Sequence, residues 1–70
     1  MKDIWIEVCF NNQPMDNVIA HTEEEAKEII QSIEQNGFSE YNEDVKNDWL
    51  EMGFNDNPKV TAYIIKGWSE

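Results

Sequence analysis

Every second position over residues 4–10 is a large apolar residue. A period of two residues is typical of a β-strand that buries one of its faces. The first face holds Ile4, Ile6, Val8 and Phe10, and the second face holds Trp5, Glu7 and Cys9. The pattern therefore predicts a first strand over 4–10.

Two further segments are predicted to be strands. Turn-forming residues occupy 11–14, and the short apolar run 18–20 would close a hairpin with the first strand. Residues 60–68 are rich in β-branched and aromatic side chains and alternate again. Their two faces hold Val60, Ala62 and Ile64, and Thr61, Tyr63 and Ile65. We expect strands over 18–20 and 60–68.

The segment that begins at Thr22 carries helix signals at both ends. Thr22 and Glu25 form a capping box, in which each residue bonds to a backbone N–H near the other. Asn36-Gly37 followed by Phe38 predicts a left-handed cap with its hydrophobic contact. The buried stripe between these ends consists of Ala26, Ile29, Ile30 and Ile33. The sequence thus predicts a first helix with defined ends.

A second amphipathic helix is predicted before Gly53-Phe54. Its apolar stripe consists of Tyr41, Val45, Trp49 and Met52, at spacings of four, four and three residues. The expected order is β-β-α-α-β in a single domain over 1–70. This is a small α+β fold, with a three-stranded antiparallel or mixed sheet and both helices on one of its faces.

Charge limits the partners that this chain can have. Its 70 residues include 15 Asp and Glu against 5 Lys and no Arg, for a formal net charge of -10. All of this net charge lies between Asp16 and Asp56, in the helical half. An anionic surface repels phosphate, so we expect no direct binding to nucleic acid or to a membrane. A partner should be basic or neutral.

The single cysteine and the apolar runs indicate a compartment. Cys9 has no second cysteine with which to form an internal disulfide, which fits a reducing cytoplasm. The apolar runs, such as 4–6 and 8–10, are at most four residues long, far shorter than a signal or membrane-spanning segment. The expected location is cytoplasmic.

Acidic residues on the outer sides of the two predicted helices are the candidate partner-binding site. One explanation is that they keep a small protein soluble and monomeric. A second is that carboxylates one helical turn apart imitate the phosphates of a nucleic acid and meet a basic groove on a protein. Binding of a divalent cation is a third. The candidate residues are Glu24, Glu28, Glu43, Asp44, Asp48, Leu50 and Glu51, of which Leu50 is either an apolar contact or an ordinary exposed leucine.

The chain lacks the residues that an active site needs. His21 precedes a helix cap, where a surface or capping role is expected, and Cys9 reads as an inert thiol. One His and one Cys do not assemble a zinc site, and Pro58 spoils the resemblance of 55–57 to a calcium loop. We therefore expect no enzyme activity, no metal and no cofactor.

Three aromatic residues on the second sheet face suggest a different interaction. Trp5, Tyr63 and Trp68 would form a dimer or partner surface if no helix covers that face. Alternatively, the same rings complete a core with two sides. Self-association would bury surface that a chain of this length otherwise leaves exposed.

As a class, the chain resembles the small acidic proteins of bacteriophages and other mobile elements, among them DNA-mimic inhibitors and anti-CRISPR proteins. The resemblance rests on size, on the β-β-α-α-β order and on two acidic rows, Glu23-Glu24-Glu25 with Glu28 and Glu43-Asp44 with Asp48 and Glu51. It implies a non-enzymatic inhibitor that blocks a basic, nucleic-acid-binding surface of a host protein. The alternative is a self-associating structural or accessory protein whose acids serve solubility.

Overall fold

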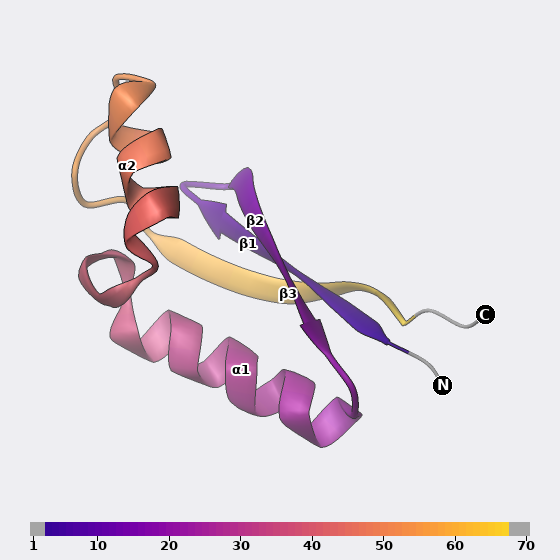
Figure 1. Cartoon of the computed structure of the whole chain (residues 1–70). Coiled ribbons are helices and arrows are strands. Elements are labelled where there is room, and N and C mark those ends of the chain that lie inside the picture. Colours follow the sequence, from indigo (N-terminus) through magenta and orange to yellow (C-terminus); the bar gives the residue numbers. More distant parts are fainter. Residues whose placement is uncertain (1–2, 68–70) are drawn as a thin grey trace.

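The computed structural model describes residues 3–67. Its elements follow in the predicted β-β-α-α-β order, with a short 3-10 helix between the two α-helices (Figure 1). The elements are β1 (Ile4–Phe10), β2 (Gln13–Ala20), α1 (Glu23–Asn36), η1 (Phe38–Glu40), α2 (Glu43–Glu51) and β3 (Val60–Gly67). The expected α+β class is confirmed.

The three strands form one antiparallel sheet in the order β2-β1-β3, so the first strand of the chain is the central one. The sequence left antiparallel and mixed arrangements open, and the antiparallel one is observed. Each outer strand carries an irregularity in its register with β1, between Val8 and Cys9 on the β2 side and between Trp5 and Ile6 on the β3 side. Such bulges bend an edge strand and increase its twist.

A tight hairpin joins β1 to β2. Asn11 and Asn12 both have positive φ, 52° and 69°, as a two-residue turn of this hand requires. The predicted four-residue turn and short second strand are therefore wrong. Gln13 and Pro14 already pair with Phe10 and Cys9, and β2 runs over eight residues. Proline fits there because β2 is an edge strand.

Carboxylates accept hydrogen bonds from backbone N–H groups on both outer strands. The N–H of Ala62 in β3 donates to Glu34 Oε2 of α1 at 3.1 Å, and the N–H of Asn17 in β2 donates to Asp16 Oδ1 at 2.9 Å. An exposed edge with unpaired N–H groups is a template for another strand. These two bonds remove one such donor from each edge.

The hydrophobic core lies between the helices and one face of the sheet, as predicted (Figure 1). Its centre is aromatic: the Phe10 ring meets the rings of Phe38, Tyr41 and Trp49 edge-on, with centroids 5.1, 5.5 and 5.4 Å away. Each such pair adds about 0.5–1.5 kcal/mol beyond its buried area. The buried members of this core are Ile4, Ile6, Val8, Phe10, Ala20, Ala26, Phe38, Trp49, Val60 and Ala62.

Both predicted ends of α1 are confirmed. Thr22 Oγ1 accepts a hydrogen bond from the Glu25 N–H at 3.0 Å. At the other end, Gly37 has a φ of 77°, and its N–H donates to the Ile33 carbonyl at 3.0 Å. The helices span 14 and 9 residues, and within residues 3–67 none is long and apolar enough to cross a membrane.

Two residues of the predicted second stripe behave differently. Tyr41 precedes α2 and reaches the core from an extended backbone conformation, because Asn42 caps a helix that starts at Glu43. Met52 follows the last helical residue and is 47% exposed, so its predicted burial is wrong. A stripe drawn at helical spacing includes both positions only if the helix extends beyond its real ends.

Candidate functional site

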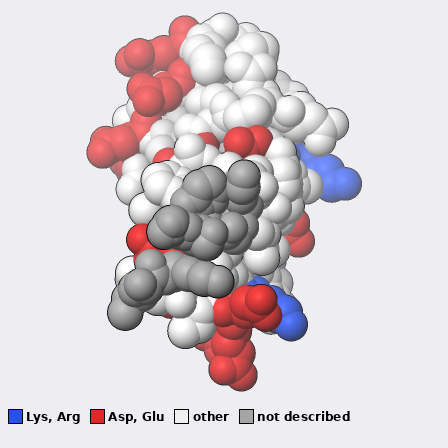
Figure 2. Space-filling view, turned by 90° about the vertical axis from the view of Figure 1, so that its right-hand side faces the viewer, with Lys and Arg blue, Asp and Glu red and all other residues white. Residues whose placement is uncertain are grey.

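The candidate acidic residues form two groups. The α1 group is Glu23, Glu24, Glu25 and Glu28, at the start of that helix. The acidic α2 surface is Glu43, Asp44, Asp48, Leu50 and Glu51. The start of α1 and the whole of α2 lie toward opposite ends of a molecule that extends 38 Å along its longest axis (Figure 1). Figure 2 shows carboxylates of one face at the top, at the bottom and at separate places between these ends. The acids thus do not form one continuous row.

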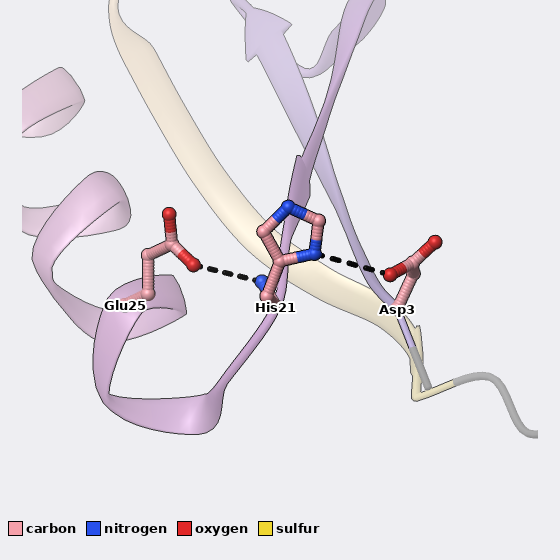
Figure 3. Close-up of polar contacts among 3 residues, drawn as sticks. All are labelled: Asp3, His21 and Glu25. Carbon is pink, nitrogen blue, oxygen red and sulfur yellow. Dashed lines mark hydrogen bonds and ion pairs between the residues drawn. The ribbon is translucent and has the colours of Figure 1, made fainter. Parts of the chain in front are cut away.

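These carboxylates are largely free of partners. Within residues 3–65, the single ion pair joins His21 Nδ1 and Asp3 Oδ1 at 3.3 Å, at the end of the sheet (Figure 3). The one lysine of α2, Lys46, donates to the Ser39 carbonyl at 2.8 Å and lies over the Phe38 ring. Its charge is therefore directed at the core side of the helix and does not pair with the acidic α2 surface.

The α1 group has a structural role. Glu25 Oε1 accepts the His21 N–H at 2.8 Å, which completes the junction between β2 and α1 (Figure 3). Glu23 and Glu24 stand in the first turn, where the positive end of the helix dipole favours a carboxylate by about 0.3–1 kcal/mol each. Stability of the fold thus accounts for most of this group, and His21 is at the surface beside the cap, as expected.

Only part of the acidic α2 surface has a structural role of this kind. Asn42 Oδ1 caps the helix by accepting the N–H groups of Asp44 and Val45 at 2.8 and 3.3 Å. Glu43 and Asp44 occupy the favourable first turn. Asp48 and Glu51 lie in the C-terminal half, where the dipole opposes negative charge, and the last turn has no basic residue. Helix stability does not explain these two carboxylates.

Two apolar side chains flank these acids. At about 100° per residue, the exposed arc of α2 runs from Leu50 through the carboxylates, and Met52 follows directly after the last helical residue. Leu50 is 42% exposed and Met52 is 47% exposed. The buried side of the helix is held by Trp49, whose Nε1 donates to the Asn55 carbonyl at 2.6 Å and whose ring stacks on Phe54. A rigid helix therefore presents an acidic arc with an apolar residue at each margin.

Within residues 3–67, no helix covers the second face of the sheet (Figure 1). This open sheet face consists of Trp5, Glu7, Cys9, Pro14, Asn17, Ile19, Thr61 and Tyr63, which the strand register places side by side. Trp5 and Tyr63 are 38% and 47% exposed, so they do not complete a two-sided core. Trp68, the third predicted member, lies outside the described residues.

A polar cluster sits at the centre of the open sheet face. The Tyr63 hydroxyl donates to Glu7 Oε2 at 2.7 Å, and the Cys9 thiol lies 3.8 Å from that oxygen and 3.9 Å from the hydroxyl. The bond to Glu7 favours the protonated phenol and raises the pKa of Tyr63 above its ordinary value. Cys9 is buried, as expected of an inert thiol. The pairing of Glu7 with Tyr63 depends on β3 register, which the sequence pattern did not define.

The described residues provide little for metal or small-molecule chemistry. Residues 3–65 bring together no three His, Cys, Asp or Glu side chains that would hold a metal ion. A wide, shallow groove of about 400 Å³ runs beside the β2 bulge and is lined by Glu7, Pro14, Met15, Asp16 and Asn17. The two oxygens of Asp16 already accept bonds from the Asn17 N–H and from the Tyr41 hydroxyl. The groove therefore offers few free polar groups to a ligand.

Comparison with protein-family models, curated proteins and solved structures finds no match to this chain. What the chain does must therefore follow from the chemistry of its own surfaces. Of these, the acidic α2 surface holds two carboxylates, Asp48 and Glu51, that helix stability does not explain.

Proposed function

We propose that the chain is a non-enzymatic protein-binding module whose acidic α2 surface docks on a basic surface of a larger protein. The observation that carries the proposal is the position of Asp48 and Glu51. They face solvent on a rigid helix, lack a basic partner within residues 3–65, and stand where they destabilise the helix. Charges that weaken a helix and have no partner within the described residues favour an interaction at that surface.

The kind of partner follows from the arrangement of charge. Asp44, Asp48 and Glu51 follow one another on α2 at intervals of about one helical turn, about 5.4 Å, which gives a row of regularly spaced negative charges like that of a nucleic acid strand. A groove that binds nucleic acid would accept such a row, and long-range attraction would speed the encounter. The module then acts as an inhibitor in the cytoplasm, of the anti-defence kind to which the chain is similar as a class.

Leu50 and Met52 add a contact that salt does not screen. Apolar side chains at the margins of a charged patch contribute burial once the encounter has brought the surfaces together. The α1 group, at the other end of the molecule, adds long-range attraction without being part of the docking site. Glu24 and Glu28 are thus assigned to steering and the acidic α2 surface to binding.

A charge-matched pair of variants tests this proposal. The tagged protein is used to capture partners from a nuclease-treated bacterial lysate, and the affinity for a captured nucleic-acid-binding protein is measured. Asp48→Asn with Glu51→Gln should lower that affinity at least about tenfold. Gln31→Lys with Gln35→Lys on α1 changes the net charge equally and should have a much smaller effect.

Competition with duplex DNA completes the test. The partner should release the protein when DNA is added, and the affinity should fall steeply as salt rises. Equal loss in both double variants would show that net charge alone drives binding. Full affinity after removal of Asp48 and Glu51, or binding that ignores salt and DNA, would contradict the proposal.

A further inference from the structure

The open sheet face has no place in the function proposed above. Trp5 and Ile19 are cross-strand neighbours on it, and Tyr63 pairs with Glu7 in the next row. These three side chains are 38%, 42% and 47% exposed, so they leave a patch of apolar surface in water. The largest apolar patch on a small monomer is often functional.

The polar groups at the centre of this face, Tyr63 and Glu7, are already paired. No buried side-chain nitrogen or oxygen within residues 3–65 lacks a partner. Cys9 is 3% exposed yet stands outside the helix-side core, beneath the pair formed by Tyr63 and Glu7. A face whose polar groups bond internally loses little when water is removed from it.

Charge is segregated away from the same face. Glu7 is the one charged residue among the described side chains of the open sheet face, whereas the helices hold the excess of acid. An approach through the helices would bring together two strongly anionic layers. An approach through the open sheet face keeps the helices on the outside. The charge distribution thus favours a second copy of the chain at this face and at no other.

We propose that two copies associate through their open sheet faces into a helix-sheet-sheet-helix sandwich with twofold symmetry. Stacked sheets lie about 10 Å apart, and a helix layer adds about 10 Å on each side, so the acidic layers end about 30 Å apart. This separation is more than three Debye lengths at physiological salt, where the Debye length is about 8 Å. Repulsion between the helices therefore does not prevent the contact.

The area indicates how tight this dimer is. Three partly exposed apolar side chains from each copy, with their polar surroundings, should bury less than the ~1,200 Å² of a standard stable interface. The dimer should therefore be weak and concentration-dependent, with a Kd between about 1 μM and 1 mM. It displays two acidic α2 surfaces on opposite outer sides, which makes the assembly bivalent toward basic partners.

Sedimentation equilibrium over a concentration series tests the dimer directly. The mass should rise toward twice that of one chain, and the Kd should not weaken between low and high salt. Ile19→Lys should weaken the dimer at least about tenfold, whereas Leu50→Lys, equal in exposure and charge change, should shift the Kd less than about twofold. If Ile19→Lys fails to fold, Asn17→Lys replaces it: Asn17 is an exposed polar residue of the same face, and its change to Lys should weaken the dimer by a similar factor.

Amide chemical shifts on dilution locate the contact. Shifts at Trp5, Ile19 and Tyr63 with an unchanged α2 support the open sheet face. A Kd weaker than about 1 mM would overturn the proposal and leave that face to a different protein. Equal weakening by Leu50→Lys, or shifts on α2, would overturn it as well by placing the contact on the helices. None of these outcomes depends on Asp48 or Glu51, so the binding proposal is tested separately.

Discussion

Tyr41 connects two parts of the fold that are distant in sequence. Its hydroxyl donates to Asp16 Oδ2 of β2 at 2.6 Å, and its ring meets Phe10 in the core. Burial and the bond to the Asp16 carboxylate both raise the pKa of Tyr41 above its ordinary value of 10.0. The native state therefore keeps the phenolic proton at a pH where the unfolded chain releases it.

Tyr41→Phe should lower the free energy of unfolding by about 1 kcal/mol, because Asp16 loses a donor and the ring remains in place. Urea unfolding at neutral pH measures the loss. The contribution is fully present below pH 10 and disappears as pH rises above it, since the folded pKa is the higher one. Tyr63→Phe is the control. An equal loss of unfolding free energy in Tyr63→Phe would show that the Tyr41 hydrogen bond stabilises the fold no more than the Tyr63 bond does.

At the scale of single elements, α2 carries opposite electrostatic contributions at its two ends. Glu43 stands in the first turn and Glu51 in the last, nine residues in all. A carboxylate is favourable at the first position and unfavourable at the second. Both side chains are exposed to solvent, so core packing does not affect the comparison.

The same substitution should therefore act with opposite sign at these positions. Glu51→Lys should raise the free energy of unfolding by about 0.5 kcal/mol, and Glu43→Lys should lower it by a similar amount. Thermal or urea unfolding at low salt gives the difference, and high salt should reduce both effects. If Glu51→Lys destabilises the protein, the assignment of Glu51 to binding loses its main support.

The elements that the sequence predicted correctly are those with a clear local signal: alternation for β1, whose bounds 4–10 are confirmed, and caps at both ends for α1. The cap at Thr22 and the glycine at 37 define α1 without tertiary information. β2 was predicted too short because Pro14 and Asp16 oppose strand formation locally, and pairing with β1 overrides them. Tyr41 and Met52 were predicted as helical core because spacing alone does not show where a helix starts or stops.

The candidate sites were less predictable, since they depend on where elements lie in space. The acids of α1 and α2 look like one surface on two helical wheels, yet the chain places them at opposite ends (Figure 1). Alternation already placed Glu7 on the second sheet face, but Ile19 joined the open sheet face, and Glu7 met Tyr63, through strand register, which residue patterns do not encode. Exposure of Leu50 was predicted correctly, because its position on α2 depends on the helix alone.

For the whole molecule, the net charge of -10 opposes compaction. Two carboxylates about 10 Å apart in water repel each other by about 0.4 kcal/mol, and many such pairs surround the helices. Salt should therefore stabilise the fold while it weakens binding to a basic partner.

The urea midpoint should rise between about 0.01 M and 1 M sodium chloride, where the Debye length falls from about 30 Å to 3 Å. A gain on the order of 1 kcal/mol is expected. Gln31→Lys with Gln35→Lys makes the net charge less negative, so the gain in the free energy of unfolding with salt should be smaller. A midpoint that does not respond to salt would mean that the unfolded chain repels itself as strongly as the folded one.

The strand order also determines how the chain reaches this structure. β1 is synthesised before β2 and β3, and it can pair early with β2 across a tight turn. Its other edge stays unpaired until β3 is available, since Phe10 pairs with Val60 and Ile4 pairs with Gly67. Closing so long a loop is slow compared with forming a hairpin or a helix. During synthesis the central strand therefore remains half-paired until the last strand leaves the ribosome, and this late pairing should limit the folding rate.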